Sequence, residues 1–249
     1  MPGIGERENM RFLADLVLIA IILMCVWSCY KKGLVVGISI ILAIVVSVYM
    51  GDLLSDTFSH EAEPVLRPFI SGYMDGSEGV INKSMEEITG TELKVSIEDA
   101  LAKDPSIKYE LAEKSYINMG IYSSSAKEMS IKVAELADRE GITFSNAIVD
   151  VFCSNIVYIL GFILFFIITM IILTVVGNVV NLNFAIPGMQ RLDKIGGAAA
   201  GLIAGFMFCI VVVWVLKFSG RLFPEEDLSR TLITALFLKM NILSGILSV

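Results

Sequence analysis

Four stretches of the chain are long, apolar and almost free of charge: residues 13–30, 34–50, 156–180 and 195–216. Asp15 is the only acidic or basic residue inside them. A helix crosses the apolar core of a bilayer with about 20 such residues, at a rise of 1.5 Å per residue. The pattern therefore predicts an all-α membrane protein with four transmembrane helices, joined in pairs by short connections as two helical hairpins.

The segment between the second and third predicted spans, residues 57–147, is polar and acidic. It holds 16 acidic and 9 basic residues, whereas the rest of the chain holds 10 of each, so this segment carries the whole net charge of −7. We therefore expect four parts: a first hairpin at 1–56, an acidic loop at 57–147, a second hairpin at 148–220 and a tail at 221–249.

Helix signals predict that the acidic loop is helical. Ser96 begins a capping-box pattern, and Asp104 precedes a proline at the start of an apolar segment. Residues 126–139 have apolar side chains at helical spacing and stop at a glycine, and Thr143 is placed to cap a helix that runs into the third span. A turn-rich link is expected where small residues cluster, around Gly72, Gly76 and Gly79.

The tail has the pattern of an amphipathic helix. Pro224 and three acidic residues form a typical helix start. Apolar residues then recur every three or four positions, at Leu228, Leu232, Leu236, Met240, Leu243 and Leu247. This spacing predicts a helix that lies in the membrane interface. The alternative is a fifth span over 232–249, which would bury Lys239 at a cost of about 2.5–3.5 kcal/mol.

Basic residues in the short connections predict the orientation. They are Lys31, Lys32, Arg191 and Lys194, and we expect them to act as cytoplasmic-side anchors. Both termini and the acidic loop would then be extracytoplasmic. Arg7 and Arg11, before the first span, favour the opposite orientation.

Three polar side chains are candidates for a role inside the membrane: Asp15, Asp150 and Asn155. A carboxylate in an apolar helix is costly, so it is a candidate for proton or ion handling. Each of the three is also explained by anchoring at the headgroups or by a hydrogen bond between helices.

Glycines recur at four-residue spacing in two of the predicted spans. They are Gly33 and Gly37 in the second, and Gly197, Gly201 and Gly205 in the fourth. This spacing places them on one face of a helix, where another backbone can approach closely. We expect a helix-packing role, with the two glycine faces meeting at the centre of a parallel pseudo-two-fold pair of hairpins. A pore lining is the alternative.

Composition excludes several classes of protein. The acidic balance leaves no basic patch for nucleic acid, and a single histidine, His60, excludes any site that needs two imidazoles. The four cysteines lie in apolar stretches and are expected to be thiols, not metal ligands or disulfides. No phosphate loop, dinucleotide fingerprint or nucleophile elbow is present. We therefore expect no enzyme activity, no cofactor and no metal.

Three segments resemble the colicin V production protein family of bacterial membrane proteins. They are Asp15 with the later pair Lys32-Gly33, the stretch from Arg191 to Gly205 with its glycines four apart, and Leu228-Ser229-Arg230 in the tail. Ala204 departs from the family pattern, because many members have a basic residue there.

The resemblance implies a multi-pass protein of the bacterial inner membrane, linked to toxin production or export and to envelope integrity. The expected function is that of a non-enzymatic component that acts through membrane or extracytoplasmic partner proteins, with homo-oligomers as a further expectation. The alternative is a subunit of a small oligomeric channel or transporter.

Overall fold

The computed structural model describes residues 4–74, 79–90, 97–179, 190–240, 243 and 247, and these residues form helices and connections without strands. The helices are α1 (Ile4–Lys32), α2 (Leu34–Met74), α3 (Val80–Thr89), α4 (Ile97–Lys103), η1 (Pro105–Ile107), α5 (Lys108–Met119), α6 (Ser123–Glu140), α7 (Phe144–Val179), α8 (Gln190–Leu216), α9 (Glu225–Leu228) and α10 (Ile233–Lys239).

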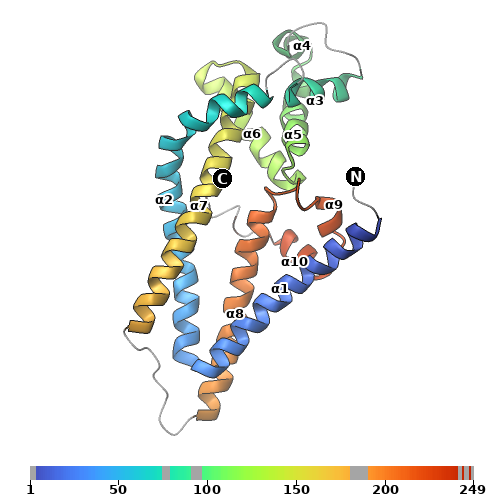
Figure 1. Ribbon diagram of the computed structural model, residues 1–249. Helices are drawn as coiled ribbons and strands as arrows, with labels where there is room; N and C mark the ends of the chain where they lie inside the picture. The colour runs from blue at the N-terminus through green and yellow to red at the C-terminus, as the bar shows by residue number, and fades with distance from the viewer. Residues whose placement is uncertain are drawn as a thin grey trace. The chain divides into compact units, whose positions relative to one another are not determined.

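The helices form two compact units (Figure 1). The first contains α1, α2 up to residue 55, α7 from residue 161, and α8 to α10. The second contains the rest of α2, α3 to α6, α7 up to residue 160, and residues 217–224.

Within the described residues, four helices are long and apolar enough to cross a membrane, in agreement with the predicted number. They cover Phe12–Lys32, Leu34–Met74, Phe144–Gly177 and Gln190–Leu216. Many of their large apolar side chains are exposed in the isolated chain, among them Leu42 on α2 and Ile171 on α7. Such surfaces are stable in contact with lipid and unstable in water.

Helix α2 is longer than its apolar segment. It continues through Pro64 and Pro68 to Met74, and its last part changes direction in Figure 1, as expected where prolines interrupt the backbone hydrogen bonds. The expectation of a turn at Gly72 was therefore wrong. Gly79 does precede a helix, α3, whereas Gly76 lies outside the described residues.

The second unit contains the helices expected in the acidic loop. The Asp104 carboxylate accepts a hydrogen bond from the Ser106 backbone N–H at 3.0 Å, at the start of η1. Helix α6 covers the predicted 126–139 and ends at Gly141, which has a positive φ of 66°. Thr143 accepts a hydrogen bond from the Asn146 backbone N–H at the start of α7. The Ser96 pattern lies outside the described residues, directly before α4.

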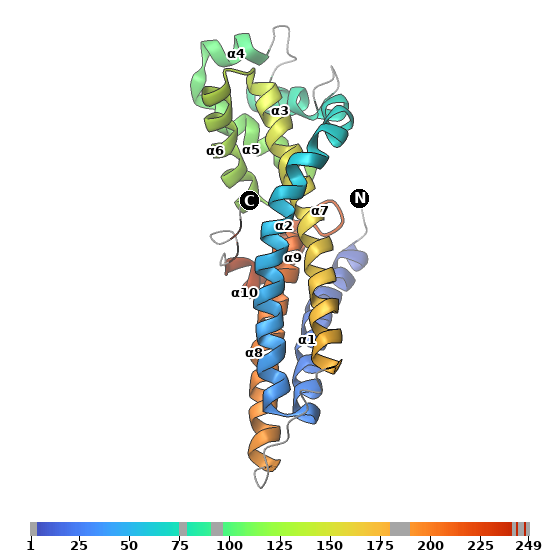
Figure 2. The same cartoon turned by 90° about the vertical axis from the view of Figure 1, so that its left-hand side faces the viewer.

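A compact apolar core holds this unit together. Met85 from α3, Leu111 from α5, Met129 from α6 and Ile148 from α7 are almost fully buried in it. Figure 2 shows α3, α5 and α6 gathered around the first part of α7. Tyr116 stacks on Phe152 with ring centroids 6.0 Å apart, and its hydroxyl donates to the Ile148 carbonyl at 2.9 Å.

Residues 217–224 are part of this unit and pack on the turn between α5 and α6. The Tyr122 N–H donates to the Lys217 carbonyl at 2.9 Å, and the Gly220 N–H donates to the Gly120 carbonyl at 2.8 Å. The Tyr122 hydroxyl donates to the Phe223 carbonyl. The segment after α8 is thus fixed to α5 and α6 before α9 begins.

In the first unit, α1 and α8 pack against each other, and α9 and α10 lie beside them (Figure 1). The small core beside α10 contains Leu18, Cys209, Val213 and Phe237, all nearly fully buried. The Phe237 ring lies 5.2 Å from that of Phe206 on α8, measured between centroids.

The tail is not the single amphipathic helix that its spacing predicts. Within the described residues it forms two short helices, α9 and α10, separated at residues 229–232. Leu228 and Phe237 are buried, whereas Leu232 is 88% exposed, so the expected apolar face is not continuous. At the break, a carboxylate from α1 accepts hydrogen bonds from the backbone N–H groups that begin α10, and the Thr231 hydroxyl of the tail accepts one from the Ala235 N–H.

Candidate functional site

Three glycines of α8, spaced four residues apart, form the contact with α1. A Cβ atom at Gly197 would lie 2.4 Å from the Cys29 carbonyl oxygen, and one at Gly201 would lie 2.6 Å from the Cys25 carbonyl oxygen. At Gly205 it would lie 2.9 Å from the Cα of Ile22. These distances are shorter than any van der Waals contact, so α1 and α8 approach this closely only because the side chains are absent.

The glycines of the second and fourth spans approach each other near the start of both helices, where an added Cβ at Gly197 would lie 2.9 Å from the carbonyl carbon of Gly33 and one at Gly37 would lie 3.4 Å from the Gly197 carbonyl oxygen. The longer part of the α8 glycine face has another partner, α1. The face of α8 that carries Gly197, Gly201 and Gly205 packs along α1. From α2, Gly37 reaches α8, where an added Cβ would lie 2.6 Å from that of Ala200. Spacing along the sequence predicted the close contact but did not determine which helix makes it.

A buried carboxylate on α8 caps the start of α2. Asp193 is 7% exposed, and its Oδ1 accepts a hydrogen bond from the Leu34 backbone N–H at 2.9 Å. Gly33 precedes Leu34 with a φ of 93°, and an added Cβ there would lie 2.4 Å from Asp193 Oδ2. The positive φ and the adjacent carboxylate both require glycine at this turn.

Asp193 was missed as a site residue by the sequence reasoning, which counted it only as a charge. A signal was present: Asp193, Gly197, Gly201 and Gly205 are four residues apart and share one helix face. A carboxylate in line with a packing face is placed to reach the end of a neighbouring helix.

Asp15, in the first half of α1, also caps a neighbouring helix, in this case α10. Its two carboxylate oxygens accept hydrogen bonds from the backbone N–H of Leu232 at 3.0 Å and of Thr234 at 2.9 Å. The Thr234 hydroxyl donates to the same carboxylate at 2.8 Å, and a longer bond comes from the Ile233 N–H. The only charge in the apolar part of α1 therefore caps α10.

The other two polar candidates have partners in the second unit. Asp150 on α7 forms an ion pair with the Arg67 guanidinium on α2. Asn155 is buried, and its amide donates to the Val151 carbonyl of its own helix at 2.7 Å. The hydrogen bonds found for Asp150 and Asn155 thus join groups within α2 and α7, whereas those of Asp15 join α1 to α10.

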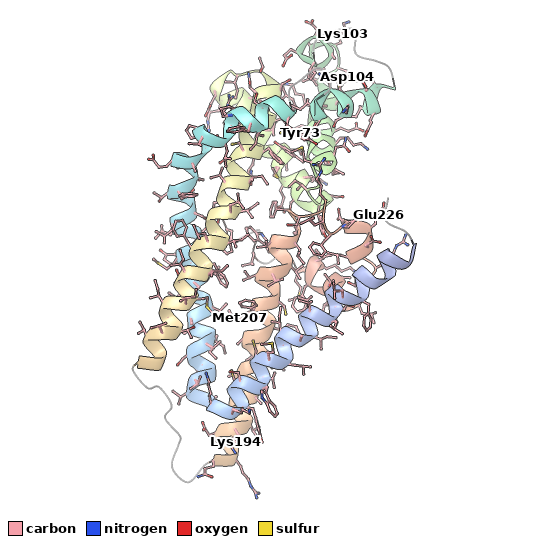
Figure 3. The ribbon with its side chains drawn as sticks, in the orientation of Figure 1. Tyr73, Lys103, Asp104, Lys194, Met207 and Glu226 are labelled. Atoms are coloured by element: carbon pink, nitrogen blue, oxygen red, sulfur yellow. The ribbon has the colours of Figure 1, made fainter. Side chains whose placement is uncertain are left out.

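The predicted basic anchors gather at one end of the α1–α8 pair. The Lys31 ammonium lies 4.6 Å from the centroid of the Trp27 ring, and the Lys194 ammonium lies 6.0 Å from that of Tyr30. Lys32 and Arg191 are exposed beside them. Figure 3 labels Lys194 near the first turns of α8, close to the end of α1.

Titratable side chains gather at one place in the second unit, where Glu63 and Arg67 on α2 lie close to Asp150 and Cys153 on α7. No cluster of three or more histidine, cysteine, aspartate or glutamate side chains among the described residues has the geometry to hold a metal ion. The four cysteines are free thiols, of which Cys29, Cys153 and Cys209 are buried. The Cys209 thiol lies 3.7 Å from the Leu18 carbonyl, a contact that joins α8 to α1.

Comparison with known proteins relates part of the chain to one family. The model of the colicin V production protein family matches residues 132–241, which run from the second half of α6 through α7 and α8 to the end of α10. This part of the chain is similar to the colicin V production protein family. No curated protein and no solved structure matches the chain.

The matched segment contains several of the interactions described above. It includes the glycine face of α8, Asp193, and the backbone groups at Thr234 that Asp15 caps. Their partners on α1 and α2 lie outside the match. The match and the four apolar helices both indicate a membrane protein.

Proposed function

We propose that the chain is a non-enzymatic component of the bacterial inner membrane that supports toxin production or export, or envelope homeostasis, by binding partner proteins. The family match supplies the link to colicin V production. One structural observation supports a non-enzymatic role: the carboxylates of Asp15 and Asp193 in the first unit cap helices. Carboxylates used in this way hold helices together and are not available as acids or bases.

The proposed partner-binding part is the helical unit formed by the acidic loop. Exposed carboxylates such as Glu110, Glu135 and Asp138 lie on α5 and α6, and the loop carries the net charge of the chain. This surface suits a partner with a basic face, since complementary charge speeds and orients association. The basic connections favour an extracytoplasmic position for the loop, with the four apolar helices arranged as two hairpins.

A charge-reversal experiment in the native host tests this function. The variant Glu110→Lys/Glu135→Lys/Asp138→Lys changes exposed side chains only, so we expect normal membrane insertion with loss of toxin export or envelope integrity. The control Lys83→Glu/Lys103→Glu/Lys127→Glu changes as many exposed charges and is expected to retain function. Full function in the first variant would contradict the proposal.

The second candidate function is that of a subunit of a small oligomeric channel or transporter. It is favoured by the position of Asp15, a carboxylate within the apolar part of α1. Ion flux into proteoliposomes that is abolished by Asp15→Asn would support transport. Absence of flux for common ions, with partner proteins recovered from native membranes in mild detergent, would support the first function.

A further inference from the structure

Four cations lie at the end of the first unit where α1 ends and α8 begins. Lys31 and Lys32 are the last residues of α1, and Arg191 and Lys194 lie in the first turns of α8. The close contact of Gly197 with Cys29 and Gly33 holds these two helix ends together. We call these four residues, with Trp27 and Tyr30, the basic end.

The charge of the basic end is not neutralised by its surroundings. Asp193 is the only acidic residue between residues 151 and 224, and its carboxylate already accepts the Leu34 N–H. Within the described residues, no salt bridge involves any of the four cations. Residues 180–189, which precede α8, contain no acidic residue in the sequence.

Exposed apolar side chains lie among the cations of the basic end. Trp27 is 61% exposed, and Leu192 and Ile195 are each 64% exposed between and beside the cations. An exposed leucine and isoleucine next to Arg191 and Lys194 are stable where acyl chains meet headgroups, but unfavourable in water. Tryptophan and tyrosine are the aromatic residues enriched at that depth of a membrane.

We propose that the basic end is a binding site for an anionic phospholipid, whose phosphate contacts Arg191 and Lys194 while its acyl chains lie along Leu192 and Ile195. Guanidinium and ammonium groups bind phosphate through charge-assisted hydrogen bonds. The aromatic rings under Lys31 and Lys194 hold two of the ammonium groups in place before the lipid binds. This inference does not depend on the proposed function.

Tryptophan quenching on the full-length protein tests the site. The chain has two tryptophans: Trp27 at the basic end, and Trp214 near the opposite end of α8, where it is buried and serves as an internal reference. The protein is reconstituted in phosphatidylcholine vesicles that contain a small fraction of brominated phosphatidylglycerol or, separately, brominated phosphatidylcholine. We expect the brominated anionic lipid to quench Trp27 at a lower fraction than the neutral one.

The variant Arg191→Gln/Lys194→Gln removes two cations and leaves Lys31 on Trp27, so the reporter is unchanged. We expect its preference for the anionic lipid to fall by about fivefold for each cation removed. The control Lys83→Gln/Lys103→Gln removes the same charge from exposed sites on α3 and α4 and is expected to keep the preference.

Three results would overturn the site. The first is equal quenching by the two brominated lipids. The second is a preference that persists in Arg191→Gln/Lys194→Gln. The third is loss of the preference when inorganic phosphate is added in large excess, which would identify a site for a free anion.

Discussion

At the residue scale, the two carboxylates of the first unit act on helices other than their own. Asp15 caps α10, and Asp193 caps the start of α2. In an apolar environment, a backbone N–H without a partner costs several times more than in water. Each carboxylate therefore determines where a neighbouring helix begins.

Replacing the Asp15 carboxylate is expected to loosen the start of α10. In Asp15→Ala, the N–H groups of Leu232 and Thr234 lose their acceptor, which costs about 1–3 kcal/mol of local stability. Hydrogen exchange of the full-length protein in detergent measures this as faster exchange over residues 232–235. In the control Asp104→Ala, a cap in the other unit is removed and exchange at these amides should not change. Unchanged exchange in Asp15→Ala would contradict the capping role.

The turn at Gly33 is expected not to tolerate a side chain. Gly33→Ala places a Cβ against Asp193 and forces a non-glycine residue to a φ of 93°, at a cost of about 1–3 kcal/mol. Gly72→Ala is the matched control, because Gly72 lies inside α2 with open space around its Cα, and alanine there is expected to be neutral or stabilising. Thermal unfolding in detergent distinguishes the two; equal midpoints would exclude this role for Gly33.

Tyr116 provides a test of the core of the second unit. Burial raises the pKa of its phenol well above the ordinary value of 10.0. Because the folded state disfavours the phenolate, stability should be constant below the ordinary tyrosine pKa and fall as the pH rises above it. Tyr116→Phe removes this loss of stability at alkaline pH. It also removes the hydrogen bond to Ile148, which lowers the free energy of unfolding by about 1 kcal/mol at neutral pH. Tyr109→Phe, at an exposed site, should change neither the stability at neutral pH nor its fall at alkaline pH, both measured by circular-dichroism unfolding.

At the scale of elements, local patterns predicted helices well and partners poorly. The apolar runs and the glycine after α6 depend on neighbouring residues alone, so spans and loop helices were predicted. The tail was predicted as one helix because its spacing does not include Asp15, a residue distant in sequence that binds the backbone where α10 begins. The glycine spacing of α8 indicated a close contact between helices, but it does not specify which neighbouring helix makes that contact.

A disulfide between α1 and α8 tests the helix pairing directly. A Cβ at position 205 would lie 3.4 Å from the Cβ of Cys25 and 2.9 Å from the Cα of Ile22, so α1 must move by a few tenths of an ångström to admit it. That movement keeps the Cβ–Cβ separation within the range of about 3.5–4.5 Å that a disulfide requires. In a protein that lacks the other three cysteines, Gly205→Cys is therefore expected to crosslink to Cys25 after mild oxidation. To detect the crosslink, the chain is cleaved by protease within the acidic loop. The fragments that contain α1 and α8 should then stay joined until a reductant is added. Ala199→Cys, on the exposed side of α8, is the control and should not crosslink; the absence of any crosslink from position 205 would contradict the pairing.

At the scale of the whole molecule, the distribution of charge predicts how the chain lies across the membrane. The acidic loop carries the entire net charge of −7, and the basic end carries four cations beside one capped carboxylate. Lysine and arginine in short connections are retained on the cytoplasmic side, whereas acidic residues contribute little to orientation. The basic end should therefore face the cytoplasm, even though Arg7 and Arg11 precede α1's apolar part.

Cysteine labelling in intact cells tests this orientation. In a protein without its native cysteines, Ser106→Cys lies at an exposed position after Asp104, and Leu192→Cys lies at the basic end. A membrane-impermeant maleimide should label position 106 in intact cells, and should label position 192 only after the inner membrane is permeabilised. Labelling in the opposite order would mean that Arg7 and Arg11 determine the orientation. The acidic loop would then be cytoplasmic, and a partner for it would have to be sought there.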